Sequence, residues 1–430
     1  MKKILFDATV LVDGNDMKEE RRGIYFVARN LLQEMCQHNQ IEIILFASSY
    51  KVAGLPYVNE MMNTNFSFYR RVSAFSKFLH CIITFFRKKR MLNFQKPLLR
   101  KMYATGILLF SIVGNVYFFI LNFFDKNLSN VVYFSPRTAS PWFINRNKKI
   151  KKYIVLHDLI PYILPEYANQ RSWGWFGYLI KHLNKEDYYF AISKATKRDY
   201  CSFSSKINPN HVMISYWAAS GLFYPIRNLK ARQQLAEHYQ INLRKRFVFT
   251  LCSLEPRKNL LRIIRSFVEF VEHNNIDDLI LVVGGGEWLD FRAFVENKLG
   301  KNYAIEKYVL HIGYVRDSDL PILYSNAEWF VFTSQYEGFG LPPLEAMQCG
   351  CPVITSNTSS LPEVVGDAGL MIDWNSDEQH IDAFEKYYYD DVLRKEKIQK
   401  GLERAKQFSW EKTVDAMVNE MNQDAEIHVS

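Results

Sequence analysis

The chain has 430 residues, which is too long for one ordinary hydrophobic core and favours two domains. Hydrophobic residues make up 48% and charged residues 23%, a balance typical of a globular protein. The six cysteines are few and scattered, which argues against a disulfide framework and for a reducing compartment. The first residues read as a strand and lack the apolar core and cleavage site of a signal peptide.

The net charge of +9 comes from one segment. Residues 61–124 contain ten Lys or Arg and no Asp or Glu, so the rest of the chain has 44 basic residues against 45 acidic ones. The excess of positive charge therefore belongs to this segment, which needs an explanation of its own.

Apolar runs separated by helical patterns predict a doubly wound sheet in the first half of the chain. A helix is expected from Gly23 to His38, between the first two strands. The runs that we expect to form the strands of this first sheet are 2–11, 41–49, 130–136, 152–158, 188–192 and 211–217.

A second alternating series follows, with helices expected at 260–273 and 361–365. Its expected strands are 246–253, 278–286, 308–315, 328–334, 351–356 and 369–373. Two successive series of strand–helix units predict an α/β protein with two Rossmann-like domains, at 1–225 and 226–407.

One stretch, 334–353, combines features of a nucleotide-sugar site. Gly338 and Gly340 allow the backbone to approach a ligand closely, and the prolines that follow suit the start of a helix. The N–H groups at a helix start favour a phosphate, whereas a carboxylate favours sugar hydroxyls. Glu337 is expected in the loop and Glu345 inside the helix, so phosphate and sugar together suggest a nucleotide-sugar.

The two glutamates have seven residues between them, which include Gly-Phe-Gly-Leu-Pro, and this pattern resembles the motif of the family-4 retaining glycosyltransferases. The resemblance implies a GT-B fold, in which two Rossmann-like domains face a cleft and residues 408–430 form a helix that packs back across it. It implies that Glu337 is catalytic beside the transferred sugar and that Glu345 binds the ribose. The residues that it places against the donor through their backbone are Gly338, Phe339, Gly340 and Leu341.

Arg257 and Lys258 lie in Ser253-Leu-Glu-Pro-Arg-Lys-Asn259, directly after an expected strand and at the start of a helix. Formal charge and the helix dipole then act together on a diphosphate. The stretch resembles the Pro-Arg-Lys-Asn donor motif of the same family, although many members have Arg in place of Ser253. The alternative is a solvated basic surface.

His157 ends a strand of the first domain in His157-Asp-Leu-Ile-Pro161, and strand ends of this kind face the crevice in open α/β sheets. The resemblance implies that this imidazole lies near the reacting sugar, where it could donate a hydrogen bond or stabilise charge. Gly23 corresponds to a glycine that approaches the donor phosphates in the family. The alternatives are a structural histidine and a glycine that only ends a loop.

The sequence indicates neither a dinucleotide-binding motif nor a metal-binding motif. Gly284-Gly-Gly-Glu287 lacks the glycine that a dinucleotide motif needs at its sixth position, where Leu289 stands. No Asp-rich metal motif is evident, so we expect neither a metal nor another cofactor. The resemblance implies that the backbone near Tyr314 reads the nucleobase, so side chains do not identify the base.

The basic segment also contains 23 residues without a charge, 102–124, after Arg87-Lys-Lys-Arg90. The run is long enough to span a bilayer, but one crossing would separate strands that should share a sheet. We expect helices that dock on the inner face of the cell membrane, with Lys and Arg on anionic headgroups. The alternative is a buried helix with a solvated basic turn, and the apolar runs suit lipid better than nucleic acid.

The sequence therefore predicts a retaining, metal-independent hexosyltransferase at the cytoplasmic membrane face. It would transfer a hexose from a nucleotide-sugar to a lipid-linked or growing polysaccharide acceptor in cell-surface polysaccharide synthesis, such as that of lipopolysaccharide or capsule. The alternatives are a soluble glycosyltransferase that acts on a small molecule or polymer, and an inactive membrane protein that binds nucleotide-sugars.

Overall fold

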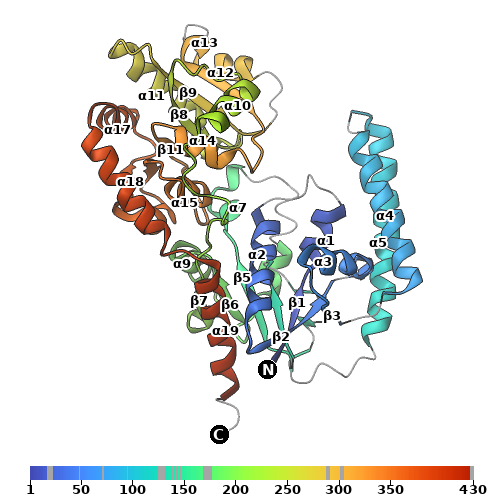
Figure 1. Cartoon of the computed structure of the whole chain (residues 1–430). Helices are drawn as coiled ribbons and strands as arrows, with labels where there is room; N and C mark the ends of the chain where they lie inside the picture. Colours follow the sequence, from blue (N-terminus) through green and yellow to red (C-terminus); the bar gives the residue numbers. More distant parts are fainter. Residues whose placement is uncertain are drawn as a thin grey trace.

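The computed structural model consists of two α/β units, each built on one parallel sheet (Figure 1). The residues that it describes are 1–16, 23–47, 49–69, 72–93, 95–123, 131–137, 140–141, 144–145, 147–167, 177–286, 291–300 and 305–426. The predicted α/β architecture with two Rossmann-like sheets is confirmed.

The first sheet has the order β3-β2-β1-β4-β5-β6-β7. Its strands are β1 (Lys2–Asp7), β2 (Ile41–Phe46), β3 (Ser67–Phe68), β4 (Val131–Ser135), β5 (Lys152–Leu156), β6 (Tyr188–Ala191) and β7 (Val212–Ile214). Every pairing is parallel, with Ile4 opposite Ile43 and Val132. The carboxyl ends of these strands therefore meet at one edge of the sheet.

The second sheet has the order β10-β9-β8-β11-β12-β13, and its pairings are also parallel. Its strands are β8 (Arg246–Leu251), β9 (Leu279–Gly284), β10 (Val309–Gly313), β11 (Phe330–Phe332), β12 (Val353–Ser356) and β13 (Leu370–Ile372). Phe330 of β11 lies opposite Phe249 of β8, so the loops that follow these two strands are neighbours. Apolar residues fill both faces of the strands, as expected for a parallel sheet covered by helices.

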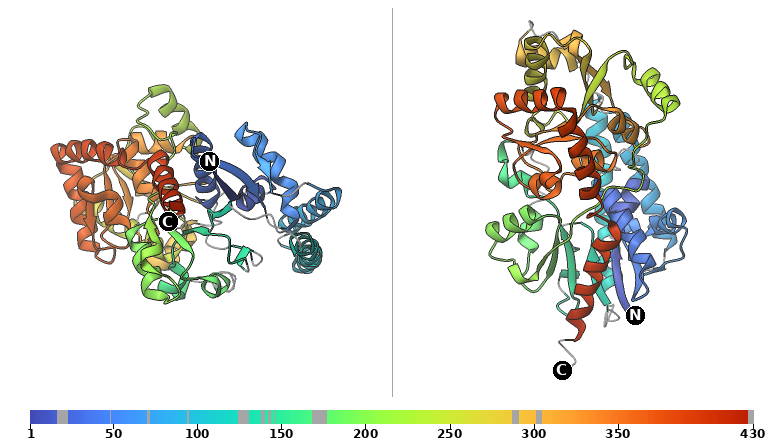
Figure 2. Two further views of the ribbon diagram at one scale, coloured as in Figure 1. Left: turned by 90° about the horizontal axis from the view of Figure 1, so that it is seen from below. Right: turned by 60° about the vertical axis from the view of Figure 1, so that its left-hand side comes forward.

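Helices cover both sheets (Figures 1 and 2). They are α1 (Thr9–Asp16), α2 (Gly23–Gln37), α3 (Leu55–Met62), α4 (Ala74–Leu92), α5 (Pro97–Phe123), α7 (Ile160–Ile163), α9 (Lys194–Phe203), α10 (Leu229–Tyr239), α11 (Leu260–His273), α12 (Phe291–Leu299), α13 (Ile305–Tyr308), α14 (Leu320–Asn326), α15 (Leu341–Gln348), α16 (Leu361–Val365), α17 (Asp377–Tyr389), α18 (Asp391–Ala405) and α19 (Trp410–Glu426). The amphipathic α11 shows why: Ile263, Phe267 and Val271 recur on one face and are buried against the second sheet.

One predicted strand ends earlier than expected. The apolar run from residue 2 suggested a strand that continues to Leu11, but β1 ends at Asp7 and α1 begins at Thr9. The carboxylate of Asp7 accepts a hydrogen bond from the backbone N–H of Thr9 at 3.0 Å, which turns the chain into a helix. The continuation of the strand to Leu11 was therefore wrong.

α4 and α5 form an antiparallel hairpin beside the first sheet (Figure 1). Leu79 and Ile83 of α4 pack against Ile107 and Phe110 of α5 in a small core of their own. Much of the remaining apolar surface is exposed, so the hairpin is not a buried part of the first domain. The large apolar side chains exposed on it are Phe75, Phe78, Phe85, Met91, Leu92, Leu98, Met102, Leu108, Leu109, Ile112, Val113 and Val116.

None of the helices that the structure describes is both long enough and apolar enough to span a membrane.

The last helix, α19, returns to the first domain and lies beside α2 (Figure 1). The carboxylate of Asp415 lies 3.5 Å from the imidazole of His38, and the Thr413 hydroxyl donates a 2.6 Å hydrogen bond to the Tyr216 carbonyl. Val418 and Met421 are fully buried. This helix therefore links the end of the second domain to the first.

The start of α9 in the first domain binds a carboxylate from the second. The N–H groups of Lys194 and Ala195 donate to the two oxygens of Glu363 at 2.8 and 3.0 Å, and the Tyr216 hydroxyl donates to the same carboxylate at 3.0 Å. A carboxylate at a helix N-terminus is stabilised by the unpaired N–H groups and by the helix dipole. Glu363 therefore holds the two domains together.

Replacing Glu363 with Ala removes these charge-assisted bonds, and we expect the two domains to separate more readily. The loss of interdomain stability should be about 1–3 kcal/mol. Small-angle X-ray scattering should give a larger radius of gyration, and urea unfolding should begin at a lower concentration. Glu403→Ala, which removes an exposed ion pair between Glu403 of α18 and Lys406 directly after that helix, is the matched control and should change neither measurement. An unchanged radius of gyration in Glu363→Ala would contradict the assignment.

Candidate functional site

Loops from both domains meet at the carboxyl edge of the two sheets. The hydroxyls of Ser193 and Thr196, at the start of α9, lie 2.8 and 3.3 Å from the carbonyl oxygen of Gly338. A Cβ atom on Gly338 would lie 2.8 Å from the Cβ of Asp158, which follows β5. The loop after β11 therefore touches the first domain directly, and only glycine fits at this position.

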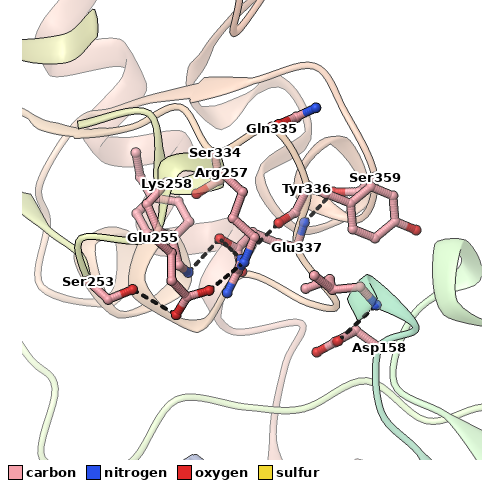
Figure 3. Close-up of polar contacts among 12 residues, drawn as sticks. Asp158, Ser253, Glu255, Arg257, Lys258, Ser334, Gln335, Tyr336, Glu337 and Ser359 are labelled. Carbon is pink, nitrogen blue, oxygen red and sulfur yellow. Dashed lines mark hydrogen bonds and ion pairs between the residues drawn. The ribbon is translucent and has the colours of Figure 1, made fainter. Parts of the chain in front are cut away.

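Glu337 lies in a cluster with the two basic residues that follow β8 (Figure 3). Its Oε1 atom is 2.6 Å from Lys258 Nζ and 3.3 Å from Arg257 Nη1. Burial raises the pKa of the Glu337 carboxyl, but the charges of Lys258 and Arg257 outweigh it and hold this pKa below its usual value. Glu337 is therefore an ionised, buried carboxylate in contact with both cations.

Arg257 is also fixed by its own loop. Its Nε donates to Glu255 at 2.8 Å and its Nη1 to the Tyr336 carbonyl at 3.1 Å (Figure 3). Ser253, where many family members have Arg, donates to the other oxygen of Glu255 at 2.9 Å. The structure thus joins Arg257, Lys258 and Glu337 in one network, although the sequence placed them in two separate motifs.

The backbone of residues 338–341 is shaped for close contact. Gly340 has φ +113°, in the region that favours glycine, and a Cβ there would lie 2.8 Å from the Leu361 side chain. Within the described residues, the N–H groups of Phe339 and Gly340 have no hydrogen-bond partner, and Leu341 is the first residue of α15. These groups are therefore available to an anion at the helix start.

The Phe339 side chain has a different role from its backbone. Its ring packs against Trp217 and Phe408 with centroids 5.9 Å from each, and it is only 3% exposed. It therefore anchors the loop to the first domain and to the segment that precedes α19, which the sequence did not indicate.

Glu345 lies in α15, with one carboxylate oxygen 3.3 Å from the Tyr324 hydroxyl. Burial is the main cause that raises its pKa to about 7, and the negative charge of Asp317 adds to this effect. Glu345 is thus about half ionised near neutral pH, unlike Glu337.

His157 is buried at the end of β5 and packs against Trp217 with ring centroids 5.4 Å apart. Its Nε2 lies 2.8 Å from the Pro136 carbonyl oxygen, so Nε2 carries the proton and Nδ1 is an acceptor. Nδ1 is buried without a partner in the described residues. Burial is the main cause that lowers the pKa of His157 to about 4, so the ring is neutral at physiological pH and is not a source of positive charge.

One residue predicted to bind the donor, Gly23, does not join this network. Gly23 is the first residue of α2, and a Cβ there would meet nothing within 4 Å, so packing does not require glycine. Arg21 and Arg22, which precede it, lie outside the described residues. In the described part of the chain, no group of three or more His, Cys, Asp or Glu side chains is arranged to hold a metal ion.

Sequence reasoning missed Asp158, whose carboxyl lies against Gly338. Burial raises the pKa of this carboxyl, and its oxygen accepts a hydrogen bond from the Ile160 N–H at 3.2 Å. Its position directly after His157 at a strand end was the available signal. Ser193, which holds the Gly338 carbonyl, had no comparable signal because it lies 145 residues away.

Most of the second domain matches a known protein family. Residues 231–404 match the family model described as "Glycosyl transferases group 1". The second domain is a group 1 glycosyltransferase domain. The matched range contains Arg257, Lys258, Glu337 and Glu345, and so includes the whole donor motif.

Two curated relatives come from Escherichia coli. "O-antigen chain mannosyltransferase B" is 40% identical over 171 residues, which cover 39% of this chain and 43% of that protein. "Serotype-specific mannosyltransferase WbdA" is 27% identical over 313 residues, which cover 70% of this chain and 36% of that protein. The chain thus spans less than half the length of these relatives.

Solved structures resemble the whole chain. A sucrose-phosphate synthase from Thermosynechococcus elongatus has a TM-score of 0.65 at 16% identity and covers 99% of this chain and 100% of its own. Anabaena HepE, solved in complex with UDP and glucose, has a TM-score of 0.62 at 14% identity and covers 98% of this chain and 100% of its own. These neighbours confirm the predicted GT-B fold.

Glu345 should make donor binding depend on pH. If its carboxylate accepts the ribose hydroxyls, binding strengthens as Glu345 ionises, and the ionised fraction rises from about one tenth to nine tenths between pH 6 and 8. The donor KM should fall by up to about tenfold over that range, and Glu345→Gln should remove the dependence. An equal pH dependence in Glu345→Gln would contradict the role.

The raised pKa of Glu345 should also make the stability of the folded protein depend on pH. Since folding raises this pKa from 4.5 to about 7, the folded state favours the protonated acid, and its stability falls as the pH rises between these values. The free energy of unfolding would be measured in urea at pH 5 and pH 8 for the wild type and for Glu345→Gln. It should fall less between these two pH values in the variant than in the wild type.

Proposed function

We propose that this protein is a retaining hexosyltransferase that transfers a sugar from a nucleotide-sugar to a lipid-linked or growing polysaccharide acceptor without a metal ion. The observation that carries the proposal is the contact of Glu337 with Lys258 and Arg257, beside the unpaired N–H groups of Phe339 and Gly340. Two cations and a helix start suit a diphosphate, and the carboxylate suits sugar hydroxyls.

On the donor side, the diphosphate would lie at the start of α15. Lys258 and Arg257 would neutralise the charge that develops on the departing diphosphate, as metal ions do in other enzymes. Glu337 would accept hydrogen bonds from the sugar, and Glu345 from the ribose.

In the reaction, the bond between the anomeric carbon and the phosphate oxygen breaks, and the acceptor oxygen forms the new bond on the same face of the sugar. The proton of the acceptor hydroxyl passes to the departing phosphate oxygen. The neutral His157 would accept a hydrogen bond from a sugar hydroxyl through Nδ1, which the structure leaves unpaired. The resulting configuration is retained.

The two Escherichia coli relatives are both named mannosyltransferases, and this supports mannose as the first hexose to test. One of them is named for the O-antigen chain, which supports cell-surface polysaccharide as the product. A panel of nucleoside diphosphate mannose and glucose donors with different bases would identify the sugar and the base together.

The hairpin supports docking on the cytoplasmic face of the cell membrane, where a lipid-linked acceptor would lie. Leu109, Ile112 and Val116 of α5 are four residues or fewer apart and between 51% and 58% exposed, so they form one apolar stripe. The segment 61–124 has no acidic residue, so its charge complements anionic headgroups.

Replacing Lys258 with Ala should lower kcat by about 10²–10³-fold, because removal of one group that stabilises developing charge costs about this much. Transfer would be measured with the donor panel and a membrane extract as acceptor. Lys395→Ala, an exposed residue of α18, is the control and should leave the rate unchanged. Full activity of Lys258→Ala would contradict the donor site. A wild type that binds a nucleotide-sugar but neither transfers nor hydrolyses it would favour an inactive binding protein.

The apolar stripe of the hairpin should be required for vesicle binding. Three acidic substitutions on it should reduce co-sedimentation with anionic vesicles by about tenfold or more, because they add charge to the surface that enters the interface. They are Leu109→Glu, Ile112→Glu and Val116→Glu.

The control adds the same charge at exposed apolar residues of the second domain and should leave vesicle binding nearly unchanged. Its substitutions are Leu229→Glu, Leu243→Glu and Val392→Glu. Equal loss of binding in both triple variants would show that overall charge alone drives association. Unchanged binding in the hairpin variant would favour the soluble glycosyltransferase.

A further inference from the structure

The residues on either side of Glu337 are held by one helix of the first domain. Before it, the Tyr336 hydroxyl donates a hydrogen bond to the carboxylate of Asp199 in α9. After it, the carbonyl of Gly338 accepts hydrogen bonds from two hydroxyls at the start of the same helix. Glu337 belongs to the second domain, but both of its chain neighbours are thus bound to the first.

The three side chains of α9 that make these contacts lie along one side of the helix. Ser193 is the N-cap residue, and Thr196 and Asp199 follow at intervals of three residues, which places them on one face. The two hydroxyl residues are buried, and the side chain of Asp199 is only 16% exposed. This face of α9 therefore presents two hydroxyls and a carboxylate to the loop between β11 and α15.

The contact between Tyr336 and Asp199 is a hydrogen bond to a carboxylate. Burial is the main cause that raises the pKa of Tyr336, and the hydrogen bond and negative charge of Asp199 add to it, so the hydroxyl keeps its proton and acts as the donor. Asp199 also lies 3.9 Å from the Nε atom of Arg198, but that side chain is 65% exposed, so this ion pair contributes little. The Tyr336 hydroxyl is therefore the stronger of these two partners.

Tyr336 also fixes one of the two cations beside Glu337. Its carbonyl accepts a 3.1 Å hydrogen bond from Nη1 of Arg257 (Figure 3). The N–H of Gln335 donates to the Arg257 carbonyl at 2.7 Å, so the two loops are joined at adjacent residues. A shift of Tyr336 would therefore move Arg257 and Glu337 together.

Separation of the two domains would remove the first-domain partners of Tyr336 and Gly338 at once. The loop would keep the contacts that come from its own domain, such as the 2.9 Å hydrogen bond from the Glu337 N–H to the Ser359 hydroxyl. That bond holds the backbone of Glu337 but not the side chain of Tyr336. The arrangement of the carboxylate and its cations is therefore supported from both domains.

We propose that Asp199 is a positioning residue, which acts through Tyr336 to hold Glu337 and Arg257 in the arrangement that sugar transfer requires. The proposal rests on the proposed function and deepens it, because it makes the donor site complete only while the two domains are in contact. A nucleotide-sugar bound to the second domain alone would then not react until α9 meets the loop. Asp199 does not need to touch the sugar or the diphosphate to have this effect.

The first test separates the rate of transfer from donor binding, with the mannose or glucose donor that the wild type uses. Tyr336→Phe removes the hydroxyl, and Asp199→Ala removes its acceptor. Each should lower kcat by about 10–100-fold, because misplacement of reacting groups by about 1 Å can cost this much, while the donor KM stays nearly unchanged. Asp199→Asn, which keeps an oxygen that can accept the bond, should recover most of the lost rate. The double variant Tyr336→Phe/Asp199→Ala should lose no more than either single variant.

Tyr389→Phe is the matched control, because it also removes a tyrosine hydroxyl that donates a hydrogen bond. This residue of α17 is 63% exposed and donates to Asn274 at 3.1 Å. The control should change neither kcat nor KM. An unchanged kcat in Tyr336→Phe would overturn the proposal. Losses that multiply in the double variant would also overturn it, since Tyr336 and Asp199 would then act independently.

A second test does not depend on transfer. Hydrogen exchange of residues 334–341 would be measured in the full chain without substrates. The N–H groups of Gln335 and Glu337 are hydrogen-bonded within the second domain, and they should exchange about tenfold faster in Tyr336→Phe and in Asp199→Ala because the loop opens more often. Unchanged exchange in this loop would overturn the proposal. Faster exchange in variants of a protein that transfers no sugar would overturn the proposed function instead, but not the contact that fixes the loop.

Discussion

The candidate site in the second domain depends on one buried carboxylate that stays ionised. Glu337 is 9% exposed, and burial of a charge without partners would be strongly unfavourable. The positive charges of Lys258 and Arg257 offset the cost of burying the Glu337 carboxylate, but these residues lie 79 and 80 positions earlier in the chain. The order of the second sheet brings them together, because β8 and β11 are neighbours and their following loops start side by side. The parallel sheet is thus the means by which charge is placed at the site.

The ion pair also occupies the cations that a donor would need. If the proposed function holds, a diphosphate at this site would draw Lys258 away from Glu337, or share it, and the carboxylate would then be free to contact the sugar. Its loop cannot move far in response, because Ser193 holds the Gly338 carbonyl and Ser360 donates to the Glu337 and Phe339 carbonyls at 3.0 and 2.6 Å. Side-chain exchange within a fixed backbone is the response that this geometry favours.

The sequence predicted local features well and contacts between distant residues poorly. The glycines at 338 and 340 and the helix after them follow from local backbone requirements, and the structure has them. The early turn at Asp7 was missed because Thr-Val-Leu-Val continues the apolar run, and only a side-chain hydrogen bond stops the strand. The tautomer of His157 depends on Pro136, and the anchoring of the hairpin depends on Arg87 reaching Asp13, 74 residues away. No periodicity in the sequence encodes such pairs.

In both domains, carboxylates reduce the repulsion between neighbouring basic side chains. In each of them, two basic side chains contact one carboxylate, Glu337 in the second domain and Asp13 in the first. Without substrates, these carboxylates limit the repulsion between cations when the domains are closed by Glu363. His157 lies on the first-domain side of the cleft, and because its ring is neutral it adds no further charge.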